Sequence, residues 1–236
     1  MTVYQLSKKL WFPDPRNAEP EGLLAFGGDL SPRRVLLAYQ MGIFPWYSSG
    51  QPILWWSPNP RLVLFPNEMH ISKSLKRVIK SKKFTITFDT RFTDVISYCA
   101  DVPRKDENGT WITDDMIEAY SHLHEQGFAH SVEVFLENEL VGGLYGISLG
   151  KSFFGESMFS LQNNASKVAL AALTDLVKQW EFDFIDCQLP TNHLKGLGAI
   201  EIRRDRFLSL LSITKRTPTR QGKWTNEASL SLGLFN

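Results

Sequence analysis

Residues 131–159 read SVEVFLENELVGGLYGISLGKSFFGESMF, and three apolar runs follow one another within this stretch. The first two runs, residues 131–136 and 140–147, flank the polar triplet ENE, which is typical of a hairpin turn. The third run covers residues 152–159 and follows after a short glycine-containing link. Strands joined by links this short pair antiparallel, because a parallel connection needs about a dozen residues or more. The stretch therefore predicts a three-stranded antiparallel meander.

Helices and single strands surround this meander. Ser31-Pro32 is typical of a helix start, and Thr113 followed by two aspartates is typical of another, which Gly127 would end. We expect helices over residues 72–80, 92–99, 113–126 and 164–180, and single strands over residues 84–88 and 184–188. This order of elements predicts an α+β, or mixed α/β, fold with a mostly antiparallel sheet.

The chain changes character after about sixty residues. The first part is dense in proline, glycine and tryptophan, whereas the remainder alternates apolar strands with amphipathic helices. This shift predicts a small N-terminal domain over residues 1–62 and a larger C-terminal domain over residues 63–236.

Composition excludes several classes of protein. The chain has 236 residues and a formal net charge of +1, with 43% hydrophobic and 22% charged residues, as in ordinary globular proteins. A charge this close to neutral argues against a histone-like coat on nucleic acid, although a local basic patch remains compatible with it. Two cysteines cannot form a disulfide framework, and neither has metal-ligand spacing. No targeting segment or membrane-length apolar run occurs, so we expect a cytoplasmic protein without a metal or a membrane span.

One predicted helix carries an uninterrupted basic face. No acidic residue occurs between residues 73 and 83, so these cations lack the opposite charges that usually stabilise a helix at this spacing. Helical periodicity gathers four cations on one side and leaves Leu75, Val78 and Ile79 on the other. The pattern predicts contact with nucleic-acid phosphates, and a simple solvated face is the alternative. The cations are Lys73, Lys76, Arg77 and Lys80.

Glu156 lies between Phe154 and Met158 on an otherwise apolar predicted strand. Buried carboxylates are rare unless they are paired or take part in binding or catalysis. An internal ion pair, for instance with Lys167 or Arg203, is the structural alternative to a functional role.

Asp186 and Gln188 are two residues apart on the last predicted strand, so we expect their side chains on one face. A polar pair at a strand end suits a reaction centre, and a hydrogen-bonded strand cap is the alternative. Ile185 and Cys187 would point to the opposite face, which favours a core position for Cys187 over a nucleophile.

Several motifs together resemble the leucyl/phenylalanyl-tRNA–protein transferase family. The resemblance extends in order from about Glu21 to Phe207. It implies a small N-terminal domain and a larger domain with the fold of the GNAT acyltransferases. It also implies transfer of Leu or Phe, with Met as a further candidate, from aminoacyl-tRNA to proteins that begin with Arg or Lys, which marks them for degradation. The motifs are GGDL at 27–30, GIFPW at 42–46, WWSP at 55–58, GTWIT at 109–113, GESMFS at 155–160, NASK at 164–167 and IDCQ at 185–188.

The resemblance also implies roles for individual residues. Trp46 and Trp111 would stack on the 3′-terminal adenosine, although from the residues alone both could be core tryptophans. Glu156 would recognise the acceptor's N-terminal Arg or Lys. The pocket for the transferred side chain would consist of Leu144, Phe153, Leu173, Val177 and Ile185.

Two expectations follow from these roles. Strict alternation puts Phe153 and Glu156 on opposite faces of one strand, so a bulge at Gly155 is needed to bring both to one site. We expect Asp186 to orient and polarise Gln188, whose amide oxygen would accept a hydrogen bond from the attacking amine.

The ester of an aminoacyl-tRNA is already activated, so we expect no requirement for ATP, CoA or a metal, and we expect a monomer. A CoA-dependent GNAT N-acetyltransferase would share the fold, but the corresponding loop at residues 161–166, LQNNAS, lacks the glycines that hold the CoA pyrophosphate in that family. A non-enzymatic RNA-binding module and an aminoacyl-tRNA-dependent peptidoglycan transferase are two further hypotheses for this chain.

Overall fold

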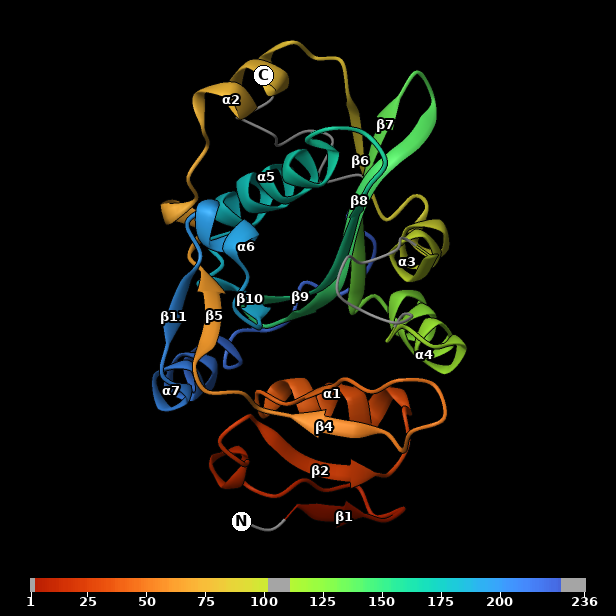
Figure 1. Cartoon of the computed structure of the whole chain (residues 1–236), viewed down its shortest axis with the longest axis vertical. Coiled ribbons are helices and arrows are strands. Elements are labelled where there is room, and N and C mark those ends of the chain that lie inside the picture. The colour runs from red at the N-terminus through yellow and green to blue at the C-terminus, as the bar shows by residue number, and fades with distance from the viewer. Residues whose placement is uncertain (1–2, 102–110, 226–236) are drawn as a thin grey trace.

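The computed structural model describes residues 3–101 and 111–225 of the chain. Two sheets form the framework, one above the other in Figure 1. The smaller has the order β1-β2-β4-β3 and the larger the order β11-β5-β10-β9-β8-β7-β6. The smaller sheet contains β1 (Tyr4–Leu6), β2 (Leu23–Gly27), β3 (Phe44–Pro45) and β4 (Leu54–Trp56). The larger contains β5 (Arg61–Leu64), β6 (Thr85–Phe88), β7 (Ala129–Leu136), β8 (Glu139–Leu149), β9 (Ser152–Ser160), β10 (Phe184–Gln188) and β11 (Ile200–Ile202).

The expected meander is confirmed as β7, β8 and β9, which pair antiparallel in sequence order. Within the larger sheet, β9 and β10 form the parallel pair, and the other pairings are antiparallel. The mixed α/β class with a mostly antiparallel sheet is therefore confirmed.

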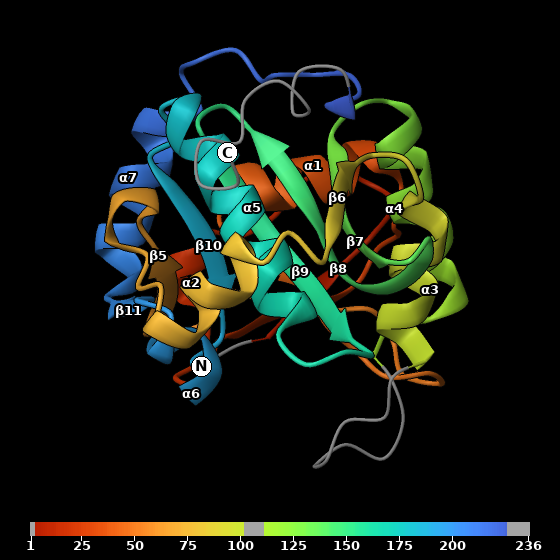
Figure 2. The ribbon, with the colours of Figure 1, turned by 90° about the horizontal axis from the view of Figure 1, so that it is seen from above.

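Helices cover both faces of the larger sheet. The helix α5 packs on one face of β8, and α3 packs on the other, as Figures 1 and 2 show. The expected helices are present with small changes at their ends, and the sequence analysis missed the strands β1, β2, β5 and β11 and the C-terminal helices α6 and α7. The helices are α1 (Pro32–Gln40), α2 (Lys73–Lys80), α3 (Phe92–Asp101), α4 (Asp114–Glu125), α5 (Ala165–Gln179), α6 (Asn192–Gly196) and α7 (Arg204–Thr214), with 3-10 turns at Pro15–Asn17 and Pro66–Glu68.

Local chemistry explains where the helices begin. Thr113 accepts a hydrogen bond from the Met116 N–H, as the sequence predicted for the start of α4. Ser72 caps α2 in the same way by accepting from Leu75. Ser31 precedes α1, but its hydroxyl donates to Asp29 and makes no cap bond.

A buried ion pair links two neighbouring strands of the larger sheet and also contacts the N-terminal part of the chain. The Arg61 guanidinium on β5 donates to both carboxylate oxygens of Asp186 on β10, over 2.8 and 2.6 Å, and also to the Gly42 carbonyl over 3.2 Å. It lies against the rings of Phe44 and Phe207, 4.8 and 4.5 Å from their centroids. Arg61 and Asp186 are fully buried, so strands β3, β5 and β10 and helix α7 meet at this pair.

The boundary at residue 62 stays a prediction. One cluster of buried side chains contains residues of both sheets, among them Trp55 from β4 and Phe184 from β10. The two parts of the chain therefore share a core.

We predict that Asp186→Ala lowers the free energy of unfolding by about 3–5 kcal/mol, because it leaves the Arg61 charge buried without a partner. The double variant Arg61→Met, Asp186→Leu should lose much less than the sum of the two single changes, since no charge is stranded. Urea unfolding of the unaltered protein, Arg61→Met, Asp186→Leu and the double variant gives the coupling free energy between the two residues.

The matched control is Arg16→Ala, which removes an ion pair with Asp14 and Asp205 at the surface. It should change stability by less than about 1 kcal/mol. If the losses in free energy of unfolding of the two single variants simply add in the double variant, Arg61 and Asp186 do not stabilise the fold as a pair.

Candidate functional site

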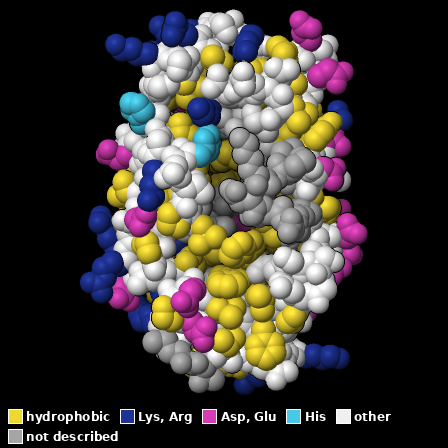
Figure 3. Space-filling view, in the orientation of Figure 1, with side chains coloured by type: hydrophobic (Ala, Val, Ile, Leu, Met, Phe, Trp, Pro, Cys, Tyr) yellow, Lys and Arg dark blue, Asp and Glu magenta, His cyan; other side chains and the backbone are white. Residues whose placement is uncertain are grey.

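A cavity of about 570 Å³ lies where two strands of the larger sheet separate. Strands β9 and β10 pair through three residue pairs, the last of them Asp186 with Phe154. Beyond this point β9 continues along β8 and β10 along β5, so the gap between them widens. Figure 3 shows hydrophobic side chains gathered across the middle of one face of the molecule, above the N-terminal part. The cavity thus results from the parting of a parallel strand pair.

Elements far apart in the sequence line this cavity. The sheet contributes residues of β8, β9 and β10, α5 and α6 form one side, and β3 with the chain before α4 provides aromatic rings. Four of the five predicted pocket residues line it, namely Leu144, Phe153, Leu173 and Ile185. Val177 is not among the residues that line this cavity; it is fully buried one turn of α5 beyond Leu173, and its place in the pocket stays a prediction. Leu173 and Val177 lie on one face of α5, but of the two only Leu173 lines the cavity.

Both predicted base-stacking tryptophans line the cavity. Trp46 is half-buried, and its ring lies 5.5 Å from that of Trp56. Trp111 is 9% exposed, which leaves an edge of the ring on the cavity wall. Of the GTWIT motif, Gly109 and Thr110 lie outside the described residues.

Glu156 reaches the cavity because β9 contains a bulge. Tyr145 of β8 pairs with Ser157 and Gly146 pairs with Gly155, so Glu156 is the extra residue between two pairs. The expected bulge therefore occurs, and it brings Glu156 and Phe153 to the same cavity.

Hydroxyl and amide groups surround the Glu156 carboxyl, which is 9% exposed. Tyr39 of α1 donates to one oxygen over 2.7 Å, and Tyr120 of α4 donates to the other over 3.0 Å. Gln188 donates its amide N–H over 2.7 Å. Among the described residues Glu156 forms no ion pair, so the alternative of a partner such as Lys167 or Arg203 is wrong.

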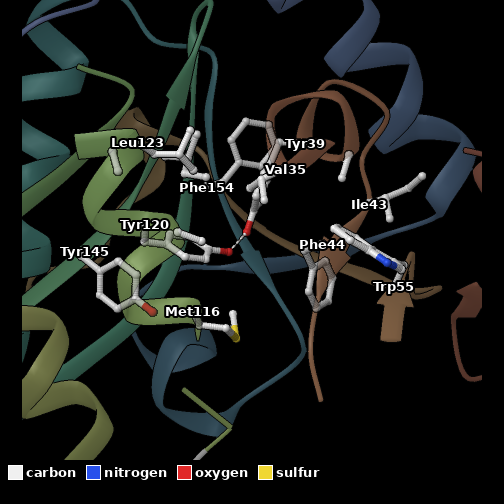
Figure 4. Close-up of a cluster of buried hydrophobic side chains, with 14 of the residues drawn as sticks. Val35, Tyr39, Ile43, Phe44, Trp55, Met116, Tyr120, Leu123, Tyr145 and Phe154 are labelled. Carbon is white, nitrogen blue, oxygen red and sulfur yellow. Dashed lines mark hydrogen bonds between the residues drawn. The ribbon is translucent and has the colours of Figure 1, made fainter. Parts of the chain in front are cut away.

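The hydroxyls of Tyr39 and Tyr120 contact each other as well as Glu156. The hydroxyl oxygens of Tyr39 and Tyr120 also lie 2.5 Å apart (Figure 4). With the bonds from both hydroxyls to Glu156, three close oxygen–oxygen contacts connect the two tyrosines and Glu156. Each contact needs one proton, and the two hydroxyls supply two. When Glu156 is protonated, its O–H supplies the third; one tyrosine then accepts from Glu156, and the hydroxyls donate in the other two contacts. Consistently, burial raises the pKa of Glu156 to about 7, although hydrogen bonds from both tyrosines act to lower it.

The backbone turns at Gln188 and changes which side chains share a face. Gln188 has a left-handed φ of 61°, and the pairing of β10 with β5 shifts between Asp186 and Gln188. Gln188 consequently lines the cavity together with Ile185 and Cys187, whereas Asp186 does not. The expectation that Asp186 and Gln188 face the same side is therefore wrong for the cavity, because strict alternation ends at the turn.

Asp186 nevertheless contacts Gln188. One of its carboxylate oxygens accepts the Gln188 backbone N–H over 2.9 Å, which holds the left-handed turn. The Gln188 side chain bonds Glu156 instead, so Asp186 acts on the position of Gln188 and makes no contact with its amide oxygen.

Cys187 lines the cavity but is poorly suited to act as a nucleophile. Burial raises the pKa of the Cys187 thiol far above its usual value, and the carboxylate of Asp186 adds to this effect. Its packing against the apolar cluster that contains Phe153 agrees with the expected structural role.

The basic helix has the predicted arrangement. Leu75 and Ile79 of α2 are buried, and the four cations Lys73, Lys76, Arg77 and Lys80 are exposed. The helix contacts α5, which forms one side of the cavity, but no α2 residue lines the cavity itself.

Sequence reasoning missed Tyr39 and Tyr120. Both are fully buried, on different helices, and each has the spacing of an ordinary core residue: Tyr39 follows Val35, and Tyr120 follows Met116, by one helical turn. No local pattern marks them, because their hydroxyls meet only when α1 and α4 pack together.

Neither a metal site nor a membrane segment is found in residues 3–101 and 111–225. No group of three or more His, Cys, Asp or Glu residues there could hold a metal ion. None of the helices in the same residues is long and apolar enough to cross a membrane.

Some solved acetyltransferase structures share part of this architecture. An aminoglycoside acetyltransferase from an uncultured soil metagenomic sample matches 49% of this chain and 85% of its own, with 16% identity and a TM-score of 0.38. A GCN5-related N-acetyltransferase from Kribbella flavida matches 70% of this chain and 59% of its own, with 10% identity and a TM-score of 0.35. Likenesses at this level carry no argument about activity.

Sequence comparison is far more specific. Residues 63–212 match the family described as leucyl/phenylalanyl-tRNA protein transferase, and residues 28–59 match the N-terminal domain of that family. The protein named leucyl/phenylalanyl-tRNA–protein transferase in Desulfatibacillum aliphaticivorans is 55% identical over 98% of this chain and 100% of its own length. The protein of the same name in Legionella pneumophila (strain Corby) is 58% identical over 91% and 96%. This chain therefore belongs to the leucyl/phenylalanyl-tRNA–protein transferase family.

Proposed function

We propose that this protein transfers an aminoacyl group from charged tRNA to the N-terminus of an acceptor protein. One observation carries the proposal beyond family membership: a buried carboxyl, Glu156, and an amide, Gln188, meet at one apolar cavity that two tryptophans also line. The apolar pocket suits the transferred side chain, the tryptophans suit the 3′-terminal adenosine, and the acidic group suits a cationic acceptor residue.

Each part of the substrates has a matching surface in this proposal. The leucyl or phenylalanyl side chain, with methionyl as a further candidate, occupies the apolar end formed by Leu144, Phe153, Leu173 and Ile185. Trp46 and Trp111 stack on the 3′-terminal adenosine, since bases of a free RNA end bind aromatic rings at about 1–3 kcal/mol each. Glu156 receives the cationic side chain of an acceptor that begins with Arg or Lys.

The reaction needs no strong general base. The acceptor α-amino group has a pKa of about 7.7–8.0, so part of it is neutral near pH 7. Its nitrogen attacks the ester carbonyl carbon, the bond from that carbon to the ribose 3′-oxygen breaks, and the amine proton passes to that oxygen. Holding ester and amine together can supply roughly 7–11 kcal/mol of the barrier reduction. In this scheme Gln188 orients the amine, and Asp186 is a positioning residue that holds Gln188.

The protonation of Glu156 couples to acceptor binding. Because burial raises its pKa to about 7, the carboxyl is largely protonated below that pH. An Arg or Lys side chain next to it favours the charged form and lowers its pKa. Acceptor binding near neutral pH should therefore release a proton.

The same proposal covers how the tRNA is held, where the protein acts and which cofactors it needs. The exposed cations of α2 hold the phosphate backbone of the tRNA without reading its sequence. The protein acts as a monomer in the cytoplasm, where charged tRNA is found, and the added residue marks the acceptor for degradation. Because the aminoacyl ester is already activated, no ATP, CoA or metal is required.

The proposal predicts transfer in a minimal mixture of purified protein, radiolabelled Phe-tRNA and a short peptide that begins with Arg. Labelled Phe should appear at the peptide N-terminus without ATP, CoA or added metal. Binding of tRNA without transfer would instead support an RNA-binding module, and acetylation from acetyl-CoA would support the acetyltransferase alternative.

We predict that Glu156→Gln raises the peptide KM on the order of tenfold, because a charged hydrogen bond contributes about 1.5–3 kcal/mol. With the unaltered protein, KM should fall as pH rises from about 6 to about 8, since Glu156 ionises through this range. This fall should be smaller in Glu156→Gln.

A peptide that begins with citrulline, the neutral isostere of Arg, is the control. The unaltered protein should prefer Arg strongly, and Glu156→Gln should discriminate weakly between the two. Equal preference for Arg over citrulline in both proteins would remove Glu156 from acceptor recognition.

For the basic helix, the double variant Lys76→Ala, Arg77→Ala should weaken tRNA binding and flatten its salt dependence. The slope of log K against log salt should fall by up to about 1.8, because each duplex phosphate that a cation neutralises adds about 0.9 to it. Lys8→Ala with Lys9→Ala removes two exposed cations elsewhere and should leave the slope unchanged. An unchanged slope in the α2 variant would show that Lys76 and Arg77 do not contact tRNA phosphates and that this face is only solvent-exposed.

A further inference from the structure

The chain after α7 runs back across the ends of the larger sheet. Thr219 accepts a hydrogen bond from the Gly150 N–H over 3.0 Å, at the turn between β8 and β9. The Gly222 N–H donates to the Gly127 carbonyl over 3.1 Å, before β7. The approach is close, since a Cβ on Gly127 would lie 2.2 Å from the Gly222 nitrogen. The tail is thus fixed at two turns of the sheet.

Beyond these turns the tail inserts one tryptophan into the protein interior. Trp224 is 3% exposed and stacks on the ring of His130, with centroids 3.7 Å apart and planes 11° apart. The ring of Trp180 meets it edge-on at 5.0 Å. The Trp224 backbone N–H donates to Asp89 over 2.7 Å, and the same carboxylate bonds His130 over 2.9 Å. The Trp224 ring is therefore packed against His130 and Trp180, and its backbone is fixed by the bond to Asp89.

Trp224 also contacts the wall of the substrate cavity. Its ring lies 6.0 Å from that of Phe153, and the two belong to the same buried cluster. Phe153 itself lines the cavity. It follows that the tail and the cavity are separated by a single aromatic ring.

The backbone of β8 also limits the freedom of the Phe153 ring. This ring lies against Gly146 of β8, where a Cβ would be only 2.5 Å from the ring. Backbone occupies that side, and interiors are packed too densely for a ring to shift into it. Trp224 therefore occupies a direction in which Phe153 could otherwise withdraw from the cavity.

We propose that Trp224 sets the depth of the pocket for the transferred side chain by holding Phe153 in place. It is a specificity-determining residue that acts through Phe153 and does not itself touch the substrate. This inference rests on the proposed function, because it assigns the apolar end of the cavity to the aminoacyl side chain. The C-terminal tail becomes part of the selection of the amino acid.

A smaller side chain at position 224 should let Phe153 withdraw and deepen the pocket. The gain should favour aminoacyl groups larger than Phe, since one methylene in an apolar pocket changes selectivity by about 10-fold to 200-fold. Transfer of Leu should benefit least, because Leu already fits.

The test compares the unaltered protein with Trp224→Leu and Trp224→Phe, using Leu-tRNA, Phe-tRNA and a tRNA charged with Trp. In Trp224→Leu the ratio of kcat/KM for the Trp-charged tRNA to that for Leu-tRNA should rise on the order of tenfold. Trp224→Phe, which keeps an aromatic ring against His130, should give a smaller rise and serves as the test if Trp224→Leu does not fold.

The matched control is Phe12→Leu, which removes a buried aromatic ring from the other cluster, against Trp55. It should lower stability without changing the ratio, and thermal unfolding shows that each variant is folded. If the folded Trp224 variants keep the original ratio, or lose activity equally with all three tRNAs, the inference is overturned while the proposed function stands. If the unaltered protein transfers nothing, both fall.

Discussion

The rest of the structure depends on the buried contact between Arg61 and Asp186. A charge pair taken out of water is stable only when its geometry is good and its remaining hydrogen-bonding groups are satisfied. Here the guanidinium bonds both carboxylate oxygens and the Gly42 carbonyl, and two aromatic rings enclose it. Through the Gly42 carbonyl and the Phe44 ring, Arg61 connects the N-terminal part of the chain with strands β5 and β10 of the larger sheet. Asp186 also accepts the Gln188 N–H, so the same pair contacts the left-handed turn that follows β10's last pairing with β9.

The site follows from that turn. Once β10 leaves β9, neither strand fills the space between them, and a cavity remains that α5 and α6 border on one side. A bulge on β9 turns Glu156 into this space, and a left-handed residue on β10 does the same for Gln188. Two departures from regular strand geometry, one on each side of the gap, bring the polar groups together.

The electrostatics of the site reflect its burial. Tyr39 and Tyr120 approach Glu156 from two helices and from both domains proposed for the chain, and with Gln188 they surround a carboxyl whose pKa burial raises to about 7. Such a group can be neutral in the empty site and charged beside a cationic ligand, which ties recognition to the assembly of the two parts. The C-terminal tail brings the ring of Trp224 against Phe153, which lines the cavity. Selectivity of the site thus depends on segments remote from it in sequence.

The sequence by itself determined the meander, the main helices, the basic face of α2 and eight of the twenty residues that line the cavity. These follow from periodicity, capping and turn residues, which act over a few positions, and from the family motifs. Only the tertiary structure decided that Arg61 holds Asp186 outside the cavity lining, that Tyr39 and Tyr120 bond Glu156, and that the ring of Trp224 lies beside Phe153. The physical reason is that a hydrogen bond or ring contact between residues up to 125 positions apart leaves no periodic trace in either segment. It exists only once both segments pack.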